Sequence, residues 1–186
     1  MQEILLHIEK MNKSNFDNFG FLFTRYRESE RTRAPDSTIL TRLKEDAFSK
    51  NPKYEVYLGK IGLEWVAYVI IIMSYSTVMA LPTLSVDELF VLDSFRNLGI
   101  GLALFEFCIR TAKKRGCGKL ELIVPDWNKK AKNFFEFNKA VPADMTCYQV
   151  GPFKTKLGVV FSPGKWQRRM LSGKRTIRLA RLNYGN

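Results

Sequence analysis

Two glycines at the start of an apolar helical pattern are well suited to binding a ligand. Gly99 and Gly101 lie in the stretch SFRNLGIGLALFEFCIR, which begins at residue 94 and includes Arg96. The first N–H groups of a helix have no partner within the helix, and together with the helix dipole they can bind phosphate. Glycine lets a phosphate approach the backbone, and Arg96 could add a charged hydrogen bond. A turn followed by a helix cap explains the same residues equally well.

Two adjacent acids, Asp87 and Glu88, lie shortly before the glycines in a strand pattern at residues 84–91. A carboxylate can take a proton from an ammonium group, which leaves a neutral amine able to attack a carbonyl. Because successive side chains of a strand point to opposite faces, we expect one acid to face a substrate cleft and the other a helix or solvent. A surface pair at a strand edge is the alternative.

A sheet with helices must position these residues. Asn12 or Ser14 is the expected cap of the first helix, and Asp36 or Ser37 is that of the second. The order of the elements predicts a mixed sheet with helices on both faces, an α/β (α+β) domain. From apolar periodicity, the predicted strands are residues 3–11, 54–60, 63–74, 84–91 and 119–125, and the predicted helices are residues 12–30, 36–49, 102–115 and 128–138.

The stretch at residues 65–86 has no charged residue and is long enough to span a bilayer. Polar residues at 74–77 and Pro82 interrupt it, and its β-branched and aromatic residues favour strands. We therefore predict two buried strands and no membrane partner. The N-terminus has no signal-peptide pattern, and the three cysteines lack both an even number and metal-site spacing. A cytoplasmic protein without a metal site is expected.

The charge of the chain is unevenly distributed. Residues 1–150 carry 21 Lys and Arg against 18 Asp and Glu, a net charge of +3, whereas residues 151–186 carry nine Lys and Arg and no acid. We expect one domain over residues 1–150 and a basic extension over 151–186, with a closing strand as one element of it. The extension could pack on a partner in a homodimer or be a solvated tail. Nucleic-acid binding is the least favoured alternative, because only the charge supports it.

Two stretches resemble a known family. Arg96–Gly101 is similar to the Arg/Gln-x-x-Gly-x-Gly/Ala signature of the GCN5-related N-acetyltransferase (GNAT) superfamily, and DWNKKAKNFF at residues 126–135 resembles its second acetyl-CoA segment, Trp-Asn-x-x-Ala-x-x-Phe-Tyr. The likeness covers about residues 3–150. The stretches DELFV and DWN look most like the diamine (spermidine/spermine) acetyltransferases. The resemblance implies the GNAT fold, with a mostly antiparallel sheet, and acetyl-CoA (coenzyme A) as the cofactor.

The resemblance also implies roles for residues of both stretches. The strand at residues 89–91 would pair its exposed backbone groups with the pantetheine arm, and the N–H of Val91 would stabilise a developing oxyanion. Residues 97–102 would wrap the pyrophosphate. Asn128 would bind the cofactor arm, unless it is only a helix cap. The implied cofactor-binding residues are Leu89, Phe90, Val91, Arg96, Asn97, Leu98, Gly99, Ile100, Gly101, Leu102, Asn128, Ala131 and Phe135.

The acetyl group would go directly to a primary amine, without a covalent enzyme intermediate. By resemblance, Asp87 is the catalytic acid near the amine, acting with the Val91 N–H, and Glu88 and Tyr26 join Asp87 in binding the substrate. The expected acceptor is a polyamine or an amino-acid-like small molecule. A protein or peptide amine is an alternative acceptor, and a CoA-binding module with little turnover is an alternative function.

Arg27 departs from the pattern of the diamine enzymes, which have an acid at this position. A cation there repels a polycationic amine, which weakens the case for a polyamine. Glu28 and Glu30 could compensate by turning inward, although charges near the end of a helix are usually solvated.

Phe135 is a second departure, because the family commonly has a tyrosine there that protonates the leaving thiolate. Phe135→Tyr should raise turnover if the site lacks a general acid, since the added phenol can donate a proton. Turnover is measured as the initial rate of CoA-thiol release from acetyl-CoA. An unchanged rate would show that another donor is already in place.

Overall fold

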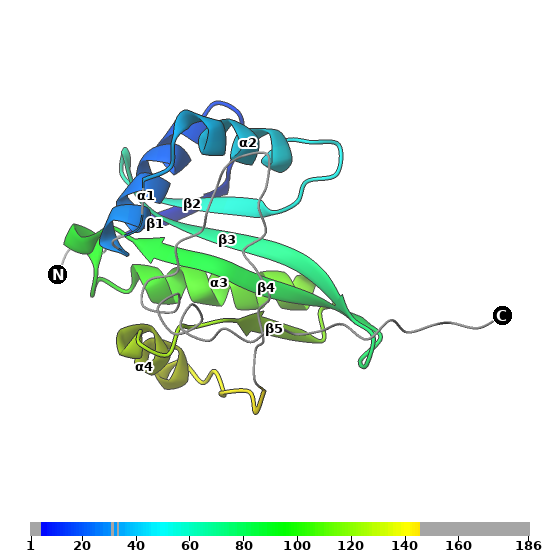
Figure 1. Cartoon of the computed structure of the whole chain (residues 1–186). Helices are drawn as coiled ribbons and strands as arrows, with labels where there is room; N and C mark the ends of the chain where they lie inside the picture. Colours follow the sequence, from blue (N-terminus) through cyan, green and yellow to red (C-terminus); the bar gives the residue numbers. More distant parts are fainter. Residues whose placement is uncertain (1–4, 31, 33, 146–186) are drawn as a thin grey trace, which may run out of the picture. The chain divides into compact units, whose positions relative to one another are not determined.

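The computed structural model describes residues 5–30, 32 and 34–145. The chain separates into two units between residues 146 and 147. The expected extension over residues 151–186, with its closing strand, lies outside the described residues and stays a prediction. In the described part the elements follow the predicted order (Figure 1): β1 (Leu6–Lys10), α1 (Phe16–Ser29), α2 (Ser37–Ala47), β2 (Glu55–Ile61), β3 (Glu64–Ser76), β4 (Leu81–Val91), the short 3-10 helix η1 (Asp93–Phe95), α3 (Ile100–Lys114), β5 (Lys119–Leu122) and α4 (Lys129–Phe137).

The five strands form one sheet in the order β1-β2-β3-β4-β5. The first four are antiparallel to their neighbours and β5 runs parallel to β4, which confirms a mixed, mostly antiparallel sheet. The uncharged stretch at residues 65–86 forms β3 and the first half of β4, joined by a turn at residues 77–80. No helix among the described residues is long and apolar enough to cross a membrane.

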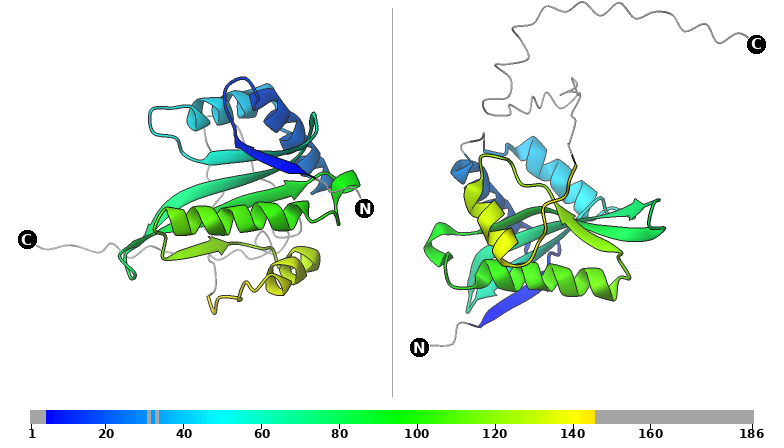
Figure 2. Two further views of the ribbon diagram at one scale, coloured as in Figure 1. Left: turned by 180° about the vertical axis from the view of Figure 1, so that it is seen from behind. Right: turned by 90° about the horizontal axis from the view of Figure 1, so that it is seen from below.

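Helices cover both faces of the sheet, as predicted. α1 and α2 lie on one face, and α3 lies along the other (Figure 2). Each face has its own buried core, since the side chains of a strand alternate between faces. The core on the α3 side includes Val66, Val69, Ile71, Leu84, Val86 and Leu104, and the core on the α1 side includes Phe19, Leu22, Leu58, Tyr68 and Phe90.

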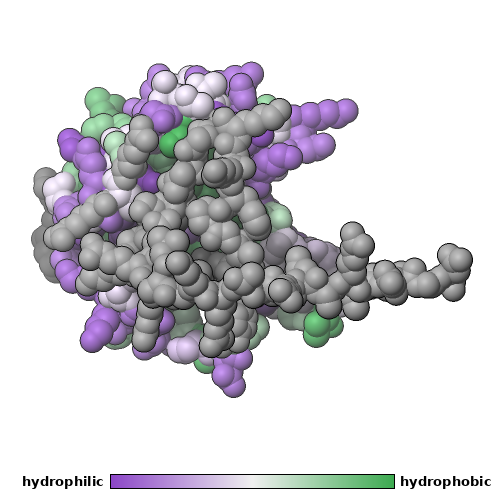
Figure 3. Space-filling view, in the orientation of Figure 1, coloured by the Kyte–Doolittle hydropathy of each residue, from purple (hydrophilic) through white to green (hydrophobic). Residues whose placement is uncertain are grey.

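The exposed surface differs between the helices and the turn that joins β3 and β4. α2 buries none of its residues fully, and the outer surface over the helices at the top of Figure 3 is mostly hydrophilic. Hydrophobic residues are exposed at the turn between β3 and β4, where Val78 and Met79 lie.

The two helix caps on the α1 side differ in outcome. Asp36 caps α2, as predicted, with its side chain accepting the N–H of Ile39 at 3.0 Å. Neither expected residue caps α1. The side-chain oxygen of Asn12 instead accepts the N–H groups of Ser14 and Asn15 at 2.8 and 3.1 Å, so the turn is closed before the helix starts. α1 therefore begins later, after Asn15 as its N-cap.

An ion-pair network fixes the end of α3 to the sheet. Arg115 follows α3 and donates two hydrogen bonds to the carboxylate of Glu55 in β2, at 2.6 and 2.9 Å. Lys10 of β1 pairs with the same carboxylate at 2.7 Å, and the hydroxyl of Tyr57 donates to it at 3.1 Å. The hydrogen bond from Arg115 is the main reason that the pKa of Glu55 falls to about 2.

Removing the charge of Glu55 should destabilise the fold. Glu55→Gln leaves Arg115 and Lys10 without their partner, so we expect the free energy of unfolding to fall by about 1–3 kcal/mol at pH 7. Because the pKa is lowered in the folded state, this stabilisation is complete above pH 4.5 and is lost as the pH falls towards 2. Urea unfolding at several pH values measures the difference.

The matched control is Glu106→Gln, which removes an exposed acid paired with Arg110 at 3.7 Å on the surface of α3. This change should alter the free energy of unfolding by less than about 0.5 kcal/mol. Equal effects of the two substitutions, or a Glu55→Gln effect that does not narrow at low pH, would contradict the structural role of the network.

Candidate active site

The edge of β4 opens at its C-terminal half. β5 pairs with β4 only over residues 83–86, whereas β4 continues to Val91. Beyond Val86, no strand in the described part of the chain pairs with the side of β4 that faces β5. Figure 1 shows β4 extending past the end of β5. The carbonyl of Val91 accepts a hydrogen bond from Arg96. The other backbone groups of this edge have no strand partner among the described residues, so they can pair with an extended ligand.

The direction of each backbone group along this edge follows from one hydrogen bond. The N–H of Leu92 donates to the carbonyl of Val66 in β3 at 2.9 Å. Since backbone groups alternate in direction along a strand, Leu89 and Val91 present theirs at the open edge. Phe90 lies opposite Tyr68, and its backbone groups point towards β3. The structure thus separates the predicted cofactor residues of β4: Leu89 and Val91 offer an edge, whereas Phe90 contributes a buried ring.

The two glycines next to this edge have different reasons for being glycine. Gly99 caps α3 with a φ of +79°, a conformation that favours glycine, and no described side chain caps the helix. Gly101 lies within the helix. A Cβ there would meet Phe134 at 3.7 Å and Leu89 at 3.9 Å, which are ordinary contacts. Neither the backbone nor the described neighbours require glycine at this position, so the structure leaves room for a small side chain there, and its role near a ligand stays a prediction.

The first turn of α3 can bind an anion. The N–H of Ala103 donates to the carbonyl of Gly99 at 3.0 Å, and the N–H groups of residues 100–102 precede this bond. They point out of the helix end, as required for phosphate. The side chains of Leu98 and Leu102 beside them are exposed. This part of the chain fits the loop that would bind a pyrophosphate.

Arg96 is held by its own neighbours. Its Nε donates to the carbonyl of Val91 at 3.2 Å, and its guanidinium pairs with Asp93 at 2.7 Å. These contacts connect the glycine loop to the end of β4. The expected phosphate contact of Arg96 stays a prediction, and the structure gives the side chain these two partners.

The second predicted segment lies against α3. Asn128 is the N-cap of α4, and its side chain accepts the N–H of Ala131 at 3.1 Å, which is the helix-cap alternative. Phe135 packs edge-on against Phe105 of α3, with ring centroids 5.2 Å apart, and Phe134 contacts both. The residue at the position of the family's tyrosine is therefore part of an aromatic cluster.

A β-bulge at Asp87 corrects the expectation for the two acids. Glu88 pairs with Ile70 of β3, and Val86 pairs with the next residue, Ile71, so Asp87 is the extra residue of β4. The bulge resets the alternation of the strand. The β4 residues that face the α3 core are Leu84 and Val86 before the bulge, and Leu89 and Val91 after it.

Asp87 and Glu88 consequently point to the same face, towards α1, and not to opposite faces. Glu88 contacts Tyr68 of the α1-side core, and the charge of Asp87 acts on both Glu88 and Tyr26 of α1. Two acids on one face, next to the open edge, can together hold an ammonium group and accept its proton.

Glu88 is poised to exchange a proton near neutral pH. Burial raises the pKa of its carboxyl to about 7, and the charge of Asp87 adds to this. The hydroxyl of Tyr68 donates to Oε2 of Glu88 at 2.8 Å, and this hydrogen bond lowers the pKa of Glu88. Burial also raises the pKa of Asp87, although its side chain is more exposed. Of the two acids, Glu88 has the properties of a general base at pH 7.

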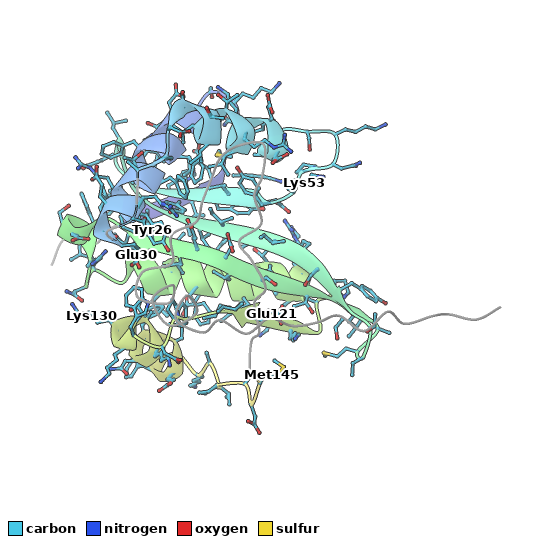
Figure 4. All side chains as sticks on the ribbon, in the orientation of Figure 1. Tyr26, Glu30, Lys53, Glu121, Lys130 and Met145 are labelled. Carbon is cyan, nitrogen blue, oxygen red and sulfur yellow. The ribbon has the colours of Figure 1, made fainter. Side chains whose placement is uncertain are left out.

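The C-terminal end of α1 completes the site. The ring of Tyr26 contacts Tyr68 and Phe90, with centroids 6.4 and 5.7 Å apart, and burial raises the pKa of its phenol. Figure 4 shows Tyr26 and Glu30 close together at this end of the helix. Glu30 is half-buried, and its charge raises the pKa of Glu88, whereas the charge of Arg27 lowers it. The structure thus places Tyr26 near both acids, and their role in binding a substrate stays a prediction.

Glu28 and Glu30, the two acids that could offset the charge of Arg27, differ in their exposure to solvent. Glu30 turns inward, and burial raises its pKa. Glu28 pairs with Arg25 at 3.1 Å on the surface. Tyr68 is the site residue that the sequence reasoning missed, and its signal was a single hydroxyl within the buried apolar stretch WVAYVIII.

Comparison with known proteins identifies this arrangement. The model of the acetyltransferase (GNAT) family matches residues 19–138, well over half of the chain. The chain belongs to this family. The match includes the bulged strand, the glycine loop and the start of α4, which are the parts that form the candidate site.

Two curated relatives are N-acetyltransferases of small amines. Thialysine N-epsilon-acetyltransferase from Mus musculus is 29% identical over an alignment of 103 residues, and the match covers 51% of this chain and 60% of that protein. L-ornithine N5-acetyltransferase from Arabidopsis thaliana is 32% identical over an alignment of 106 residues, and the match covers 55% of this chain and 46% of that protein. This GNAT chain thus spans about half the length of these relatives.

A solved structure agrees with the fold. A possible acetyltransferase from Clostridium difficile 630 superposes on 82% of this chain and 100% of its own, with a TM-score of 0.72 and 17% sequence identity. This likeness shows that the GNAT fold is shared.

Substitutions at Gly101 test the phosphate loop of this GNAT chain. Gly101→Val should weaken acetyl-CoA binding at least about 10-fold, a loss of about 1.4 kcal/mol, because its branched side chain blocks the approach to the N–H groups. Gly101→Ala is the control, since its Cβ makes ordinary contacts and the family signature allows alanine. Calorimetric titration measures binding, and thermal unfolding checks the fold. Normal binding by a folded Gly101→Val protein would contradict the loop's role.

Proposed function

We propose that this chain is an acetyl-CoA-dependent N-acetyltransferase that acts on the side-chain amine of a small amino acid. The observation that carries the proposal is the pair of acids at the bulge, Asp87 and Glu88, on the face of β4 next to its open edge. An amine held by these acids lies beside the backbone groups of Leu89 and Val91. A nucleophile, its base and a backbone donor then meet at one point of the strand.

Two parts of the chain would hold two parts of the cofactor. The open edge of β4 would hold the extended pantetheine arm, and the first turn of α3 would hold the pyrophosphate. When bound, acetyl-CoA supplies an acetyl group as a thioester. The N–H of Val91 donates to the carbonyl oxygen as negative charge develops on it. Arg96 holds the carbonyl of the same residue at 3.2 Å and so limits the movement of this part of the strand.

The structure favours a division of roles between the two acids that differs from the family resemblance. Glu88, with a pKa of about 7, is best suited to accept the proton of the ammonium group. Asp87 is more exposed and can hold the ammonium by its charge. Both roles require the same face of the strand, which the bulge provides.

The charges at the end of α1 support an amino acid as the acceptor. Asp87, Glu88 and Glu30 are acidic and suit an amine, whereas Arg27 is a cation that suits a carboxylate. A polyamine would place positive charge near Arg27. Thialysine and ornithine, which the relatives' names mention, are amino acids with a second amine at the end of the side chain. We therefore propose an amino acid of this kind over a polyamine or a protein lysine.

A CoA-binding module with little turnover is the second candidate function, and Phe135 supports it. A leaving thiolate needs a proton, and the ring of Phe135 lies in an aromatic cluster and cannot donate one. The hydroxyls beside the acids are those of Tyr26 and Tyr68, whose pKa values are raised by burial.

A homodimer and a cytoplasmic location also stay predictions.

An acceptor panel tests the proposal. CoA-thiol release from acetyl-CoA is measured with L-ornithine, thialysine, putrescine, spermidine and a lysine peptide. We expect the highest kcat/KM with L-ornithine or thialysine, and a rate that rises as the pH passes about 7, because Glu88 accepts a proton only when ionised. Binding of acetyl-CoA without turnover on any amine would favour the second candidate. Absence of binding would contradict both.

The role of Glu88 is tested in the same assay. Glu88→Gln should lower kcat by about 100-fold or more while acetyl-CoA still binds, because the base is lost and the open edge is intact. Glu28→Gln removes an exposed acid that pairs with Arg25 on the surface of α1, and it should leave the rate unchanged. Equal rates for wild type and Glu88→Gln would rule out Glu88 as the base.

A further inference from the structure

Tyr68 lies beneath the acids, and among the described residues its hydroxyl has one hydrogen-bond partner. Its side chain is fully buried, and its hydroxyl donates to Oε2 of Glu88 at 2.8 Å. Its ring is held in position by Phe19, Tyr26 and Phe90, with ring centroids 5.4, 6.4 and 5.7 Å away. The phenol therefore has little freedom to follow Glu88 if the carboxylate turns.

The contact determines how Glu88 is oriented. Oε2 accepts the hydroxyl of Tyr68, and no described donor bonds to Oε1, so Oε1 is the oxygen available to an acceptor amine in the proposed site. A carboxylate on a flexible side chain would otherwise rotate between several positions, and only some of them place an oxygen next to an amine. The hydrogen bond of Tyr68 thus connects the core on the α1 side to the carboxylate of Glu88.

We propose that Tyr68 is a positioning residue of acetyl transfer, because its hydroxyl holds Glu88 with one oxygen directed at the acceptor amine. This inference rests on the proposed function. Tyr68 acts through Glu88 and makes no contact of its own with the acceptor.

The contact also affects the protonation of Glu88. The hydroxyl of Tyr68 stabilises the ionised carboxyl and lowers its pKa against the effect of burial. The other groups that act on Glu88 are Asp87 of the same strand, Tyr26, Arg27 and Glu30 of α1, and Tyr54 before β2. Removing only the hydroxyl of Tyr68 leaves all of them in place, so a change in the pH profile can be assigned to the lost hydrogen bond.

Tyr68→Phe tests the proposal with little change in shape. We expect kcat to fall about 10-fold, acetyl-CoA binding to stay unchanged, and the rising limb of the pH profile to move up by roughly one pH unit. The control is Tyr57→Phe, which removes a hydroxyl that donates to Glu55 at 3.1 Å on the other face of the sheet. This control should leave kcat and the pH profile unchanged.

A second measurement separates this inference from the proposed function. NMR titration of the Glu88 carboxyl carbon should show a higher pKa in Tyr68→Phe than in wild type, whether or not any amine is acetylated. An unshifted Glu88 titration would overturn the inference. So would a folded Tyr68→Phe protein with the wild-type kcat and pH profile, or a loss of activity matched by Tyr57→Phe. A wild-type protein without turnover would refute only the proposed function, and the titration would still decide the role of Tyr68.

Discussion

One extra residue in β4 determines what this end of the sheet can do. Without the bulge at Asp87, regular alternation along β4 would direct Asp87 and Glu88 to opposite faces. With it, both acids face α1, while Leu89 and Val91 keep their side chains in the α3 core. The same segment begins just where β5 stops pairing with β4. Acids and free backbone groups are thereby brought together on one short stretch of strand.

The glycine loop depends on the same segment. Arg96 bonds to the carbonyl of Val91 and pairs with Asp93, so the loop is fixed to the last residue of β4. Any movement of the strand end would move both the open edge and the first turn of α3. At the other end of α3, Arg115 holds the helix to β2 through Glu55. The helix whose first N–H groups we propose to bind phosphate is thus secured at both ends.

Much of this fold could be predicted from the sequence, because its elements carry local signals. The order of strands and helices follows from apolar periodicity, and the start of α2 follows from Asp36. Residue type and spacing indicated a turn at the glycines before α3, whereas its binding of phosphate stays a prediction. The same local chemistry misled at the first helix, where Asn12 closes a turn before the helix and does not cap it.

The parts that could not be predicted depend on pairing between distant residues. A bulge is defined by the partner strand, since Ile70 and Ile71 lie opposite Glu88 and Val86, and no pattern within β4 shows this. The contact of Tyr68 with Glu88 likewise joins residues 20 positions apart. Lys139 shows the reverse case: it is not a glycine, yet its φ is +65°. The backbone keeps a conformation that favours glycine, because the hydrogen bonds that end α4 require it, including that from Ala140 to Phe135. Residue type alone therefore gives a weaker guide at such positions than the tertiary contacts on either side.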